Sequence, residues 1–381
     1  MNEQTVKPTS PEERLARLPL REDLRGQHPY GAPQLDVPIM LNVNENTYGV
    51  PEDVRDAITD AVREAVSTLN RYPDREFTEL REALAEYLGH GLSADQLWAA
   101  NGSNEVLQQL LQAFGGPGRS ALGFPPTYSM YPLLAAGTGT EYVKGVRDAD
   151  YGLSAESAAR QVRDLAPNIV FLCSPNNPTG TALGLDVVEA VYDAGEASQA
   201  IVIVDEAYAE FAQLGTESAL TLLPGRPRLV VSRTMSKAFA LAGARLGYLA
   251  AAPEVTDALR LVRLPYHLSA VTQATALAAL RHRASLMSEV EAIKHQRDRI
   301  VKELKRLGLR PAASDSNFVF FTGLADAQRI WRGLLEVGVL VRDVGIPGSL
   351  RVTAGTESET SAFLSRLGEL LAEERAEGPA R

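Results

Sequence analysis

The chain contains very little cysteine and no long apolar run. One cysteine, Cys173, is present in 381 residues, so an intramolecular disulfide is excluded and a reducing compartment is expected. Cys173 lies in an apolar stretch, which is typical of a small buried side chain rather than a nucleophile. No apolar run reaches the ~18 residues of a membrane-spanning helix. Charged residues interrupt the N-terminal segment where a secretory signal would be apolar, so we expect a cytoplasmic protein.

The chain also has fewer basic than acidic residues. The chain has 38 lysine and arginine residues against 48 aspartate and glutamate residues, and its formal net charge is -10. This balance argues against nucleic acid or an anionic membrane as the main partner. It remains compatible with a phosphorylated small molecule, because a few arginines can bind such an anion locally. We therefore expect small-molecule substrates.

Hydrophobic patterning predicts an α/β fold with two domains. Continuous apolar runs that alternate with helical patterns are typical of a mostly parallel sheet flanked by helices. We assign residues 41–270 to this large domain. A smaller α+β domain is expected from residues 18–40 and 271–381, and residues 1–17 are expected to form an N-terminal arm. The predicted strands are Ala121–Phe124, Ile169–Cys173, Ile201–Val204, Leu229–Ser232, Gly247–Ala251, Phe318–Phe321, Val339–Val341 and Leu350–Thr353.

The helical pattern is clearest in six segments. Apolar residues recur there at the spacing of one helix face. The longest segment, 270–307, is expected to form one continuous charged helix. The predicted helices are Val54–Leu69, Phe77–Leu88, the segment with the apolar stripe from Val106 to Phe114, 270–307, 325–337 and 357–373.

Four polar clusters follow predicted strands of the large domain. Open α/β sheets bind ligands beyond the carboxyl ends of their strands, so we expect the clusters to meet there. Together they offer what pyridoxal 5′-phosphate (PLP) requires: a carboxylate for the ring nitrogen, donors for the phenolic oxygen, a lysine that forms a Schiff base with the aldehyde, and an anion site. The clusters are Asn101–Asn104, Ser174–Gly180, Asp205–Tyr208 and Ser232–Lys237.

Each group on PLP has candidate residues. Asp205 would face the ring nitrogen, and Asn177 and Tyr208 would hold the phenolic oxygen. Lys237 is the catalytic candidate. The phosphate would lie at the start of a helix, where backbone N–H groups point at an anion, with hydroxyls and a cation beside it. The phosphate candidates are Gly102, Ser103, Asn104, Thr234, Ser236 and Arg245.

The spacing of these motifs resembles the fold type I PLP-dependent aminotransferases of the aspartate aminotransferase kind. Asn177 precedes Asp205 by 28 residues, Asp205 precedes Lys237 by 32, and Lys237 precedes Arg245 by 8. The resemblance covers nearly the whole chain, from about Leu18 to Leu371. Within this superfamily the chain is similar to the histidinol-phosphate aminotransferases. That similarity rests on Leu18–Leu24, Pro29–Pro33, Leu41–Asn46, Arg71–Pro73, Pro126–Tyr131, Arg233–Phe239 and Leu350–Gly355.

The resemblance implies an activity and further site residues. The enzyme would move an amino group between histidinol phosphate or imidazole acetol phosphate and glutamate or 2-oxoglutarate, in histidine biosynthesis, as a homodimer. Tyr128 would stack on the PLP ring, and Tyr72 would reach the phosphate from the partner subunit. For Tyr131 the sequence leaves packing and a site role equally open. The implied substrate-binding residues are Tyr30, Asn177, Asn317, Arg342 and Arg351, and no metal is expected.

Other functions remain open at this point. An aromatic amino-acid aminotransferase would share every PLP contact. A PLP-dependent decarboxylase of a phosphorylated amino acid can use the same scaffold. A PLP-sensing transcription regulator would need a DNA-binding domain before the PLP domain, for which the predicted arm is too short.

Overall fold

A computed structural model describes residues 10–27, 31 and 34–377. Its centre is a seven-stranded sheet with the order β2-β8-β7-β6-β5-β3-β4. Strands β3 to β7 pair in parallel, and β8 is antiparallel to both of its neighbours. The predicted mostly parallel sheet is confirmed. Its strands are β2 (Leu97–Ala100), β3 (Ser120–Gly123), β4 (Glu141–Lys144), β5 (Ile169–Cys173), β6 (Ile201–Asp205), β7 (Leu229–Thr234) and β8 (Gly247–Ala251).

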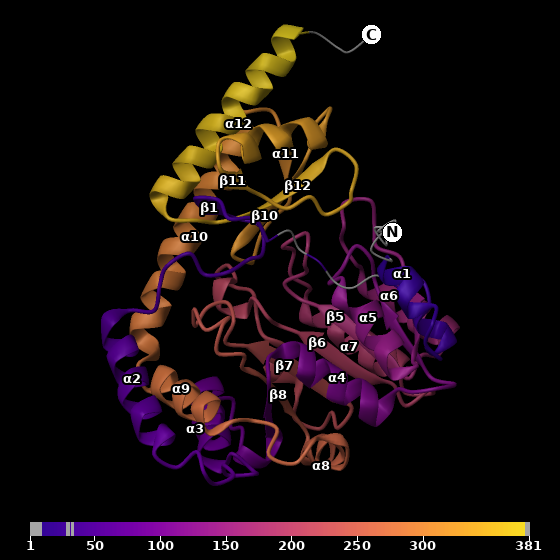
Figure 1. Ribbon diagram of the computed structural model, residues 1–381. Coiled ribbons are helices and arrows are strands. Elements are labelled where there is room, and N and C mark those ends of the chain that lie inside the picture. Colours follow the sequence, from indigo (N-terminus) through magenta and orange to yellow (C-terminus); the bar gives the residue numbers. More distant parts are fainter. Residues whose placement is uncertain (1–9, 28–30, 32–33, 378–381) are drawn as a thin grey trace, which may run out of the picture.

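Helices flank this sheet, which explains why its inner strands are apolar over most of their length. Every residue of β5, β6 and β7 is buried. A strand covered on both faces reads as a continuous apolar run rather than an alternating one. Figure 1 shows the helices arranged around the sheet. They are α4 (Ser103–Phe114), α5 (Met130–Thr138), α6 (Ala155–Leu165), α7 (Leu185–Ala194) and α8 (Pro253–Val262).

The later part of the chain forms a second, three-stranded sheet. Strand β10 (Phe318–Thr322) lies between β9 (Arg310–Pro311) and β12 (Ser349–Thr353) in an antiparallel sheet. Helices α11 (Ala327–Glu336) and α12 (Glu357–Glu377) accompany it (Figure 1).

The segment 18–40 contacts both parts of the molecule. Arg21 donates to the carbonyl of Ala136 in α5 at 3.1 Å. Strand β1 (Ile39–Met40) instead pairs in parallel with β11 (Val339–Leu340). The division into residues 41–270 and residues 18–40 with 271–381 stays a prediction. The short helical elements are α1 (Pro11–Leu15), η1 (Glu22–Leu24), η2 (Ala94–Gln96), η3 (Ala209–Phe211) and η4 (Ala219–Leu222).

The predicted continuous helix over 270–307 is wrong. The chain forms α9 (Ala270–Arg281) and α10 (Arg283–Arg306), with a break at His282, where φ is -104° and ψ is 20°. Helix α9 packs on α2 (Glu52–Val66) and α3 (Thr78–Leu88), whereas α10 carries the chain to the sheet around β10 (Figure 1). The two helices therefore pack on different surfaces, and no proline or glycine in the sequence marks the break between them. Among the described residues, no helix has the length and apolar character needed to cross a bilayer.

The strand register brings the polar clusters to one edge of the large sheet. Cys173 at the end of β5 pairs with Asp205 of β6, and Asp205 pairs with Ser232 of β7. Parallel strands end on the same side, so the residues that follow them meet there.

Gly247, the first residue of β8, lies against the start of α4. An added Cβ would be 2.5 Å from the Cα of Ser103 and closer still to its backbone nitrogen. Because backbone atoms cannot rotate away, we expect Gly247→Ala to lower the free energy of unfolding by about 1–3 kcal/mol, the usual cost of overpacking. Chemical denaturation measures this loss.

Gly243→Ala is the matched control, because its added Cβ would have no atom within 4 Å. An unfolding midpoint for Gly247→Ala equal to that of Gly243→Ala would contradict the proposed close packing of β8 on α4.

Candidate active site

A cavity of about 180 Å³ lies at the carboxyl edge of β5, β6 and β7. Its walls come from this edge, from the start of α4 and from β12 of the second sheet. Most of the site residues predicted from the sequence meet here. They are Ser103, Asn104, Tyr128, Asn177, Asp205, Tyr208, Thr234, Ser236, Lys237, Arg245 and Arg351.

The side-chain amine of Lys237 is the nucleophile of the cavity. Its ammonium group donates to the carbonyl of Val43 at 3.1 Å. Burial lowers the pKa of Lys237 to about 8, and the positive charge of Arg351 acts in the same direction. A lower pKa gives a larger neutral fraction near pH 7, as attack on an aldehyde or proton abstraction requires.

Asp205 places a buried carboxylate at the end of β6. Its residue surface is 2% exposed. It accepts hydrogen bonds from Tyr131 at 2.9 Å and from Ser232 at 3.1 Å. Burial raises the pKa of Asp205, and no cation among the described residues forms an ion pair with it. A buried anion of this kind is stabilised by a cationic partner, and the protonated ring nitrogen of PLP fits that need.

The start of α4 forms an anion-binding corner. Gly102 precedes the helix with φ of 83°, and no side chain of the described residues caps this end. The guanidinium of Arg245 lies so close to Gly102 that a Cβ there would collide with it. The hydroxyls of Thr234 and Ser236 lie 3.0 Å apart on the same cavity wall. Free helical N–H groups, hydroxyls and a guanidinium together suit a phosphate.

A hydrogen-bonded network connects the two sheets across the cavity. The hydroxyl of Tyr208 accepts from Asn177 at 3.3 Å and from Asn44 at 3.0 Å. Arg351 of β12 donates to the side-chain oxygen of Asn177 at 2.6 Å and to the carbonyl of Asn42 at 2.7 Å. The network therefore fixes an amide and a phenol near Lys237, where the phenolic oxygen of PLP requires donors.

Tyr128 forms another part of the wall. Its hydroxyl donates to the side-chain oxygen of Asn104 at 3.1 Å. Its ring packs edge-on against Tyr131, with centroids 5.4 Å apart. A ring held in this way is suited to stacking on a flat ligand.

Two predicted substrate residues lie beside the cavity rather than in its lining. The backbone of Arg342 pairs with that of Arg351 through two 2.9 Å hydrogen bonds, but Arg342 lines a separate hollow with Trp331. Asn317 is fully buried, and its amide donates to the carbonyl of Asn44 at 3.1 Å. Asn317 therefore holds the backbone of Asn44, whose side chain belongs to the network.

One predicted tyrosine, Tyr72, does not line the cavity of its own chain. Tyr72 is 80% exposed and stacks on Tyr266, with ring centroids 4.4 Å apart. Tyr30 lies outside the described residues.

Several residues of the site were missed from the sequence. Val43 contributes a backbone carbonyl, which carries no sequence signal because every residue has one. Asn44 stands in the motif Leu41–Asn46, so its presence in that motif was the available signal. Cys173 was expected to be merely buried, yet it also lines the cavity. The residues missed are Val43, Asn44, Cys173 and Ala207.

Comparisons with known proteins agree with this geometry. The sequence profile of the family described as "Aminotransferase class I and II" matches residues 37–367. The histidinol-phosphate aminotransferase of Paenarthrobacter aurescens (strain TC1) is 80% identical over 359 residues, which cover 94% of this chain and 96% of the relative. That of Frankia casuarinae is 60% identical over 359 residues, covering 93% of this chain and 90% of the relative.

A solved structure is similar over most of its length. It is the histidinol-phosphate aminotransferase from Sinorhizobium meliloti, which was crystallised in complex with PLP. The TM-score is 0.80 at 26% sequence identity, and the match covers 88% of this chain and 92% of that one.

The lowered pKa of Lys237 can be measured in the cofactor-free protein. We expect its pulse labelling by reductive methylation to follow a titration with a midpoint near pH 8 rather than the usual lysine value of 10.5, because the buried neutral amine is the favoured form. Peptide mass spectrometry across a pH series gives the midpoint, with exposed Lys144 as the internal comparison.

Arg351→Gln removes the second cause of the shift and should move the midpoint upward, although burial remains. A wild-type midpoint at or above the usual lysine value would contradict the low-dielectric cavity.

Proposed function

We propose that this chain, which belongs to the class I and II aminotransferase family, transfers an amino group between histidinol phosphate and 2-oxoglutarate. It is a PLP-dependent enzyme with the type I fold of that family. The observation that carries the proposal is the single cavity in which Lys237 lies with Asp205 and Arg351. The 80% identical relative supports the substrate and a role in histidine biosynthesis.

The residues of the cavity divide the chemistry among them. Bound PLP supplies an electron sink for the carbanion that forms when the substrate loses a proton. Asp205 holds a proton at the ring nitrogen by hydrogen bonding and charge. Lys237 Nζ would hold the aldehyde carbon of the cofactor in the absence of substrate. With substrate bound, the same Nζ would remove the proton from the amine-bearing carbon and redeliver it, acting as general base and then as general acid.

Arg351 is our candidate for the substrate's anionic group. Histidinol phosphate presents a phosphate, whereas glutamate presents carboxylates, and a planar guanidinium can bind both. The hydrogen bonds from Arg351 to Asn177 and to the carbonyl of Asn42 hold the guanidinium beside Lys237. Arg342, whose backbone pairs with that of Arg351, remains a predicted source of additional positive charge for the phosphate. Tyr30 and Asn317 remain predicted substrate contacts.

We infer a homodimer from the surface around Tyr72. Tyr72 lies outside the cavity of its own chain and stacks on Tyr266. Each of these tyrosines has an exposed apolar residue close to it in the sequence: Leu69, 53% exposed, precedes Tyr72, and Leu264, 75% exposed, precedes Tyr266. Burial of this surface against a second copy would let Tyr72 reach the partner's phosphate corner. The buried free thiol of Cys173 supports the cytoplasm as the location.

Steady-state turnover tests the proposed substrate. We expect histidinol phosphate to give a higher kcat/KM than phenylalanine, each with 2-oxoglutarate as the amino acceptor. Arg351→Lys should lower kcat/KM for histidinol phosphate about tenfold to a hundredfold, because a paired charged contact is lost. Arg310→Lys, an exposed arginine on β9 of the same sheet, is the matched control and should behave like wild type.

A wild-type enzyme that turned over phenylalanine better than histidinol phosphate would favour the aromatic aminotransferase. Release of carbon dioxide from a phosphorylated amino acid, without amino transfer, would favour the decarboxylase.

A further inference from the structure

Tyr131 is a fully buried tyrosine near the start of α5, and nothing in the proposed chemistry so far uses it. Its ring stacks on Phe171 of β5, with ring centroids 4.4 Å apart and an interplanar angle of 6°.

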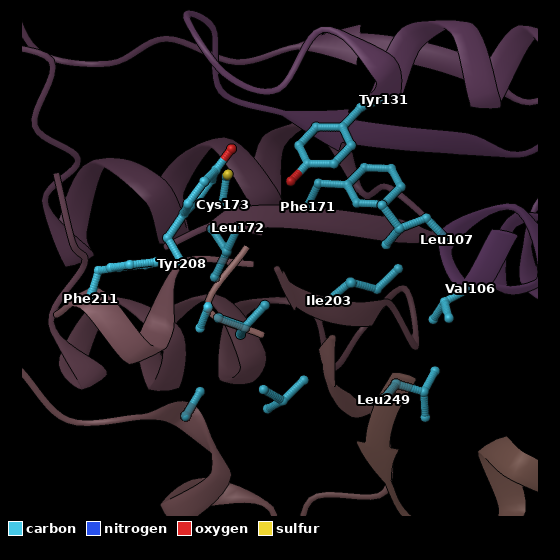
Figure 2. Packing of buried hydrophobic residues seen from close by; sticks show 14 of the residues in the cluster. Val106, Leu107, Tyr131, Phe171, Leu172, Cys173, Ile203, Tyr208, Phe211 and Leu249 are labelled. Carbon is cyan, nitrogen blue, oxygen red and sulfur yellow. The ribbon is translucent and has the colours of Figure 1, made fainter. Parts of the chain in front are cut away.

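Figure 2 shows the two rings beside each other. This stack directs the hydroxyl of Tyr131 to the carboxyl edge of the sheet, where it donates to Asp205 Oδ2 at 2.9 Å.

The surroundings of Asp205 leave few groups that stabilise its charge. Glu206 is adjacent, but Arg233 neutralises it at 2.7 Å. The thiol of Cys173 lies across the strand pairing and is held protonated, because burial raises its pKa to about 12. Side-chain donors to the carboxylate are therefore Tyr131 and Ser232. Burial raises the pKa of Tyr131 as well, so its hydroxyl keeps the proton that it donates.

We propose that Tyr131 is a positioning residue, whose hydroxyl orients the Asp205 carboxylate and keeps it ionised opposite the ring nitrogen of PLP. The inference rests on the proposed PLP-dependent function. Tyr131 touches neither substrate nor cofactor in this role and acts through Asp205. Its edge-on contact with Tyr128 connects the same ring to the wall on which the cofactor would stack.

Tyr131→Phe separates this role from packing, because phenylalanine retains the ring that stacks on Phe171 and loses only the donor. The readout is the ¹⁵N chemical shift of the ring nitrogen in holoenzyme loaded with ¹⁵N-labelled PLP. Wild type should lie in the protonated range, and Tyr131→Phe should move toward neutral pyridine, because loss of the donor raises the proton affinity of Asp205. We expect kcat to fall about tenfold with little change in KM, since a hydrogen bond to a charged group is lost.

Two further variants complete the test. Ser232→Ala removes the other donor and should shift the ¹⁵N signal in the same direction. Tyr248→Phe is the matched control, because the hydroxyl of Tyr248 is buried on β8 without a hydrogen-bond partner among the described residues. It should leave both the signal and kcat as in wild type.

The outcomes distinguish the inference from its premise. Wild-type protein that binds no PLP would overturn the proposed function and the role of Tyr131 with it. Wild type that binds PLP, together with a Tyr131→Phe variant whose ¹⁵N shift and kcat are unchanged, would overturn the role of Tyr131 alone. A variant that loses thermal stability without a ¹⁵N shift would also overturn it and would assign Tyr131 to packing.

Discussion

The carboxylate of Asp205 is buried at the end of β6, and the rest of the site is arranged around that charge. A buried carboxylate is costly unless hydrogen bonds and a positive charge compensate it. Tyr131 and Ser232 supply hydrogen bonds, and the cavity leaves the positive charge to a ligand. The same low-dielectric surroundings lower the pKa of Lys237. Exclusion of water therefore favours both a cationic partner for Asp205 and a neutral amine at Lys237.

The topology of the sheet makes this arrangement possible. Parallel pairing of β5, β6 and β7 aligns Cys173, Asp205 and Ser232 at one edge. The close approach of β8 to α4, which requires glycine at position 247, holds the anion corner at the same edge. The second sheet then contributes Arg351, whose bonds to Asn177 and to the carbonyl of Asn42 join the two parts across the cavity.

Much of the site could be predicted because its polar residues directly follow apolar strands at fixed intervals. Lys237, Asp205 and Asn177 were identified from that pattern. The carbonyl of Val43 could not be, because a backbone group leaves no mark on the sequence. The break at His282 was missed because no proline or glycine marks it in the sequence, whereas the packing partners of the two helices differ. Arg342 was assigned to the substrate by the resemblance to the family, whereas in the structure it lines a separate hollow with Trp331.

The most direct test of this account is to trap the cofactor on the protein. The PLP-loaded enzyme would be reduced with borohydride, digested and mapped by mass spectrometry, with Lys237→Ala treated in parallel. The account predicts a reduced cofactor adduct on Lys237 in wild type and none in the variant. An adduct on a different lysine, or equal labelling of Lys237→Ala, would contradict it.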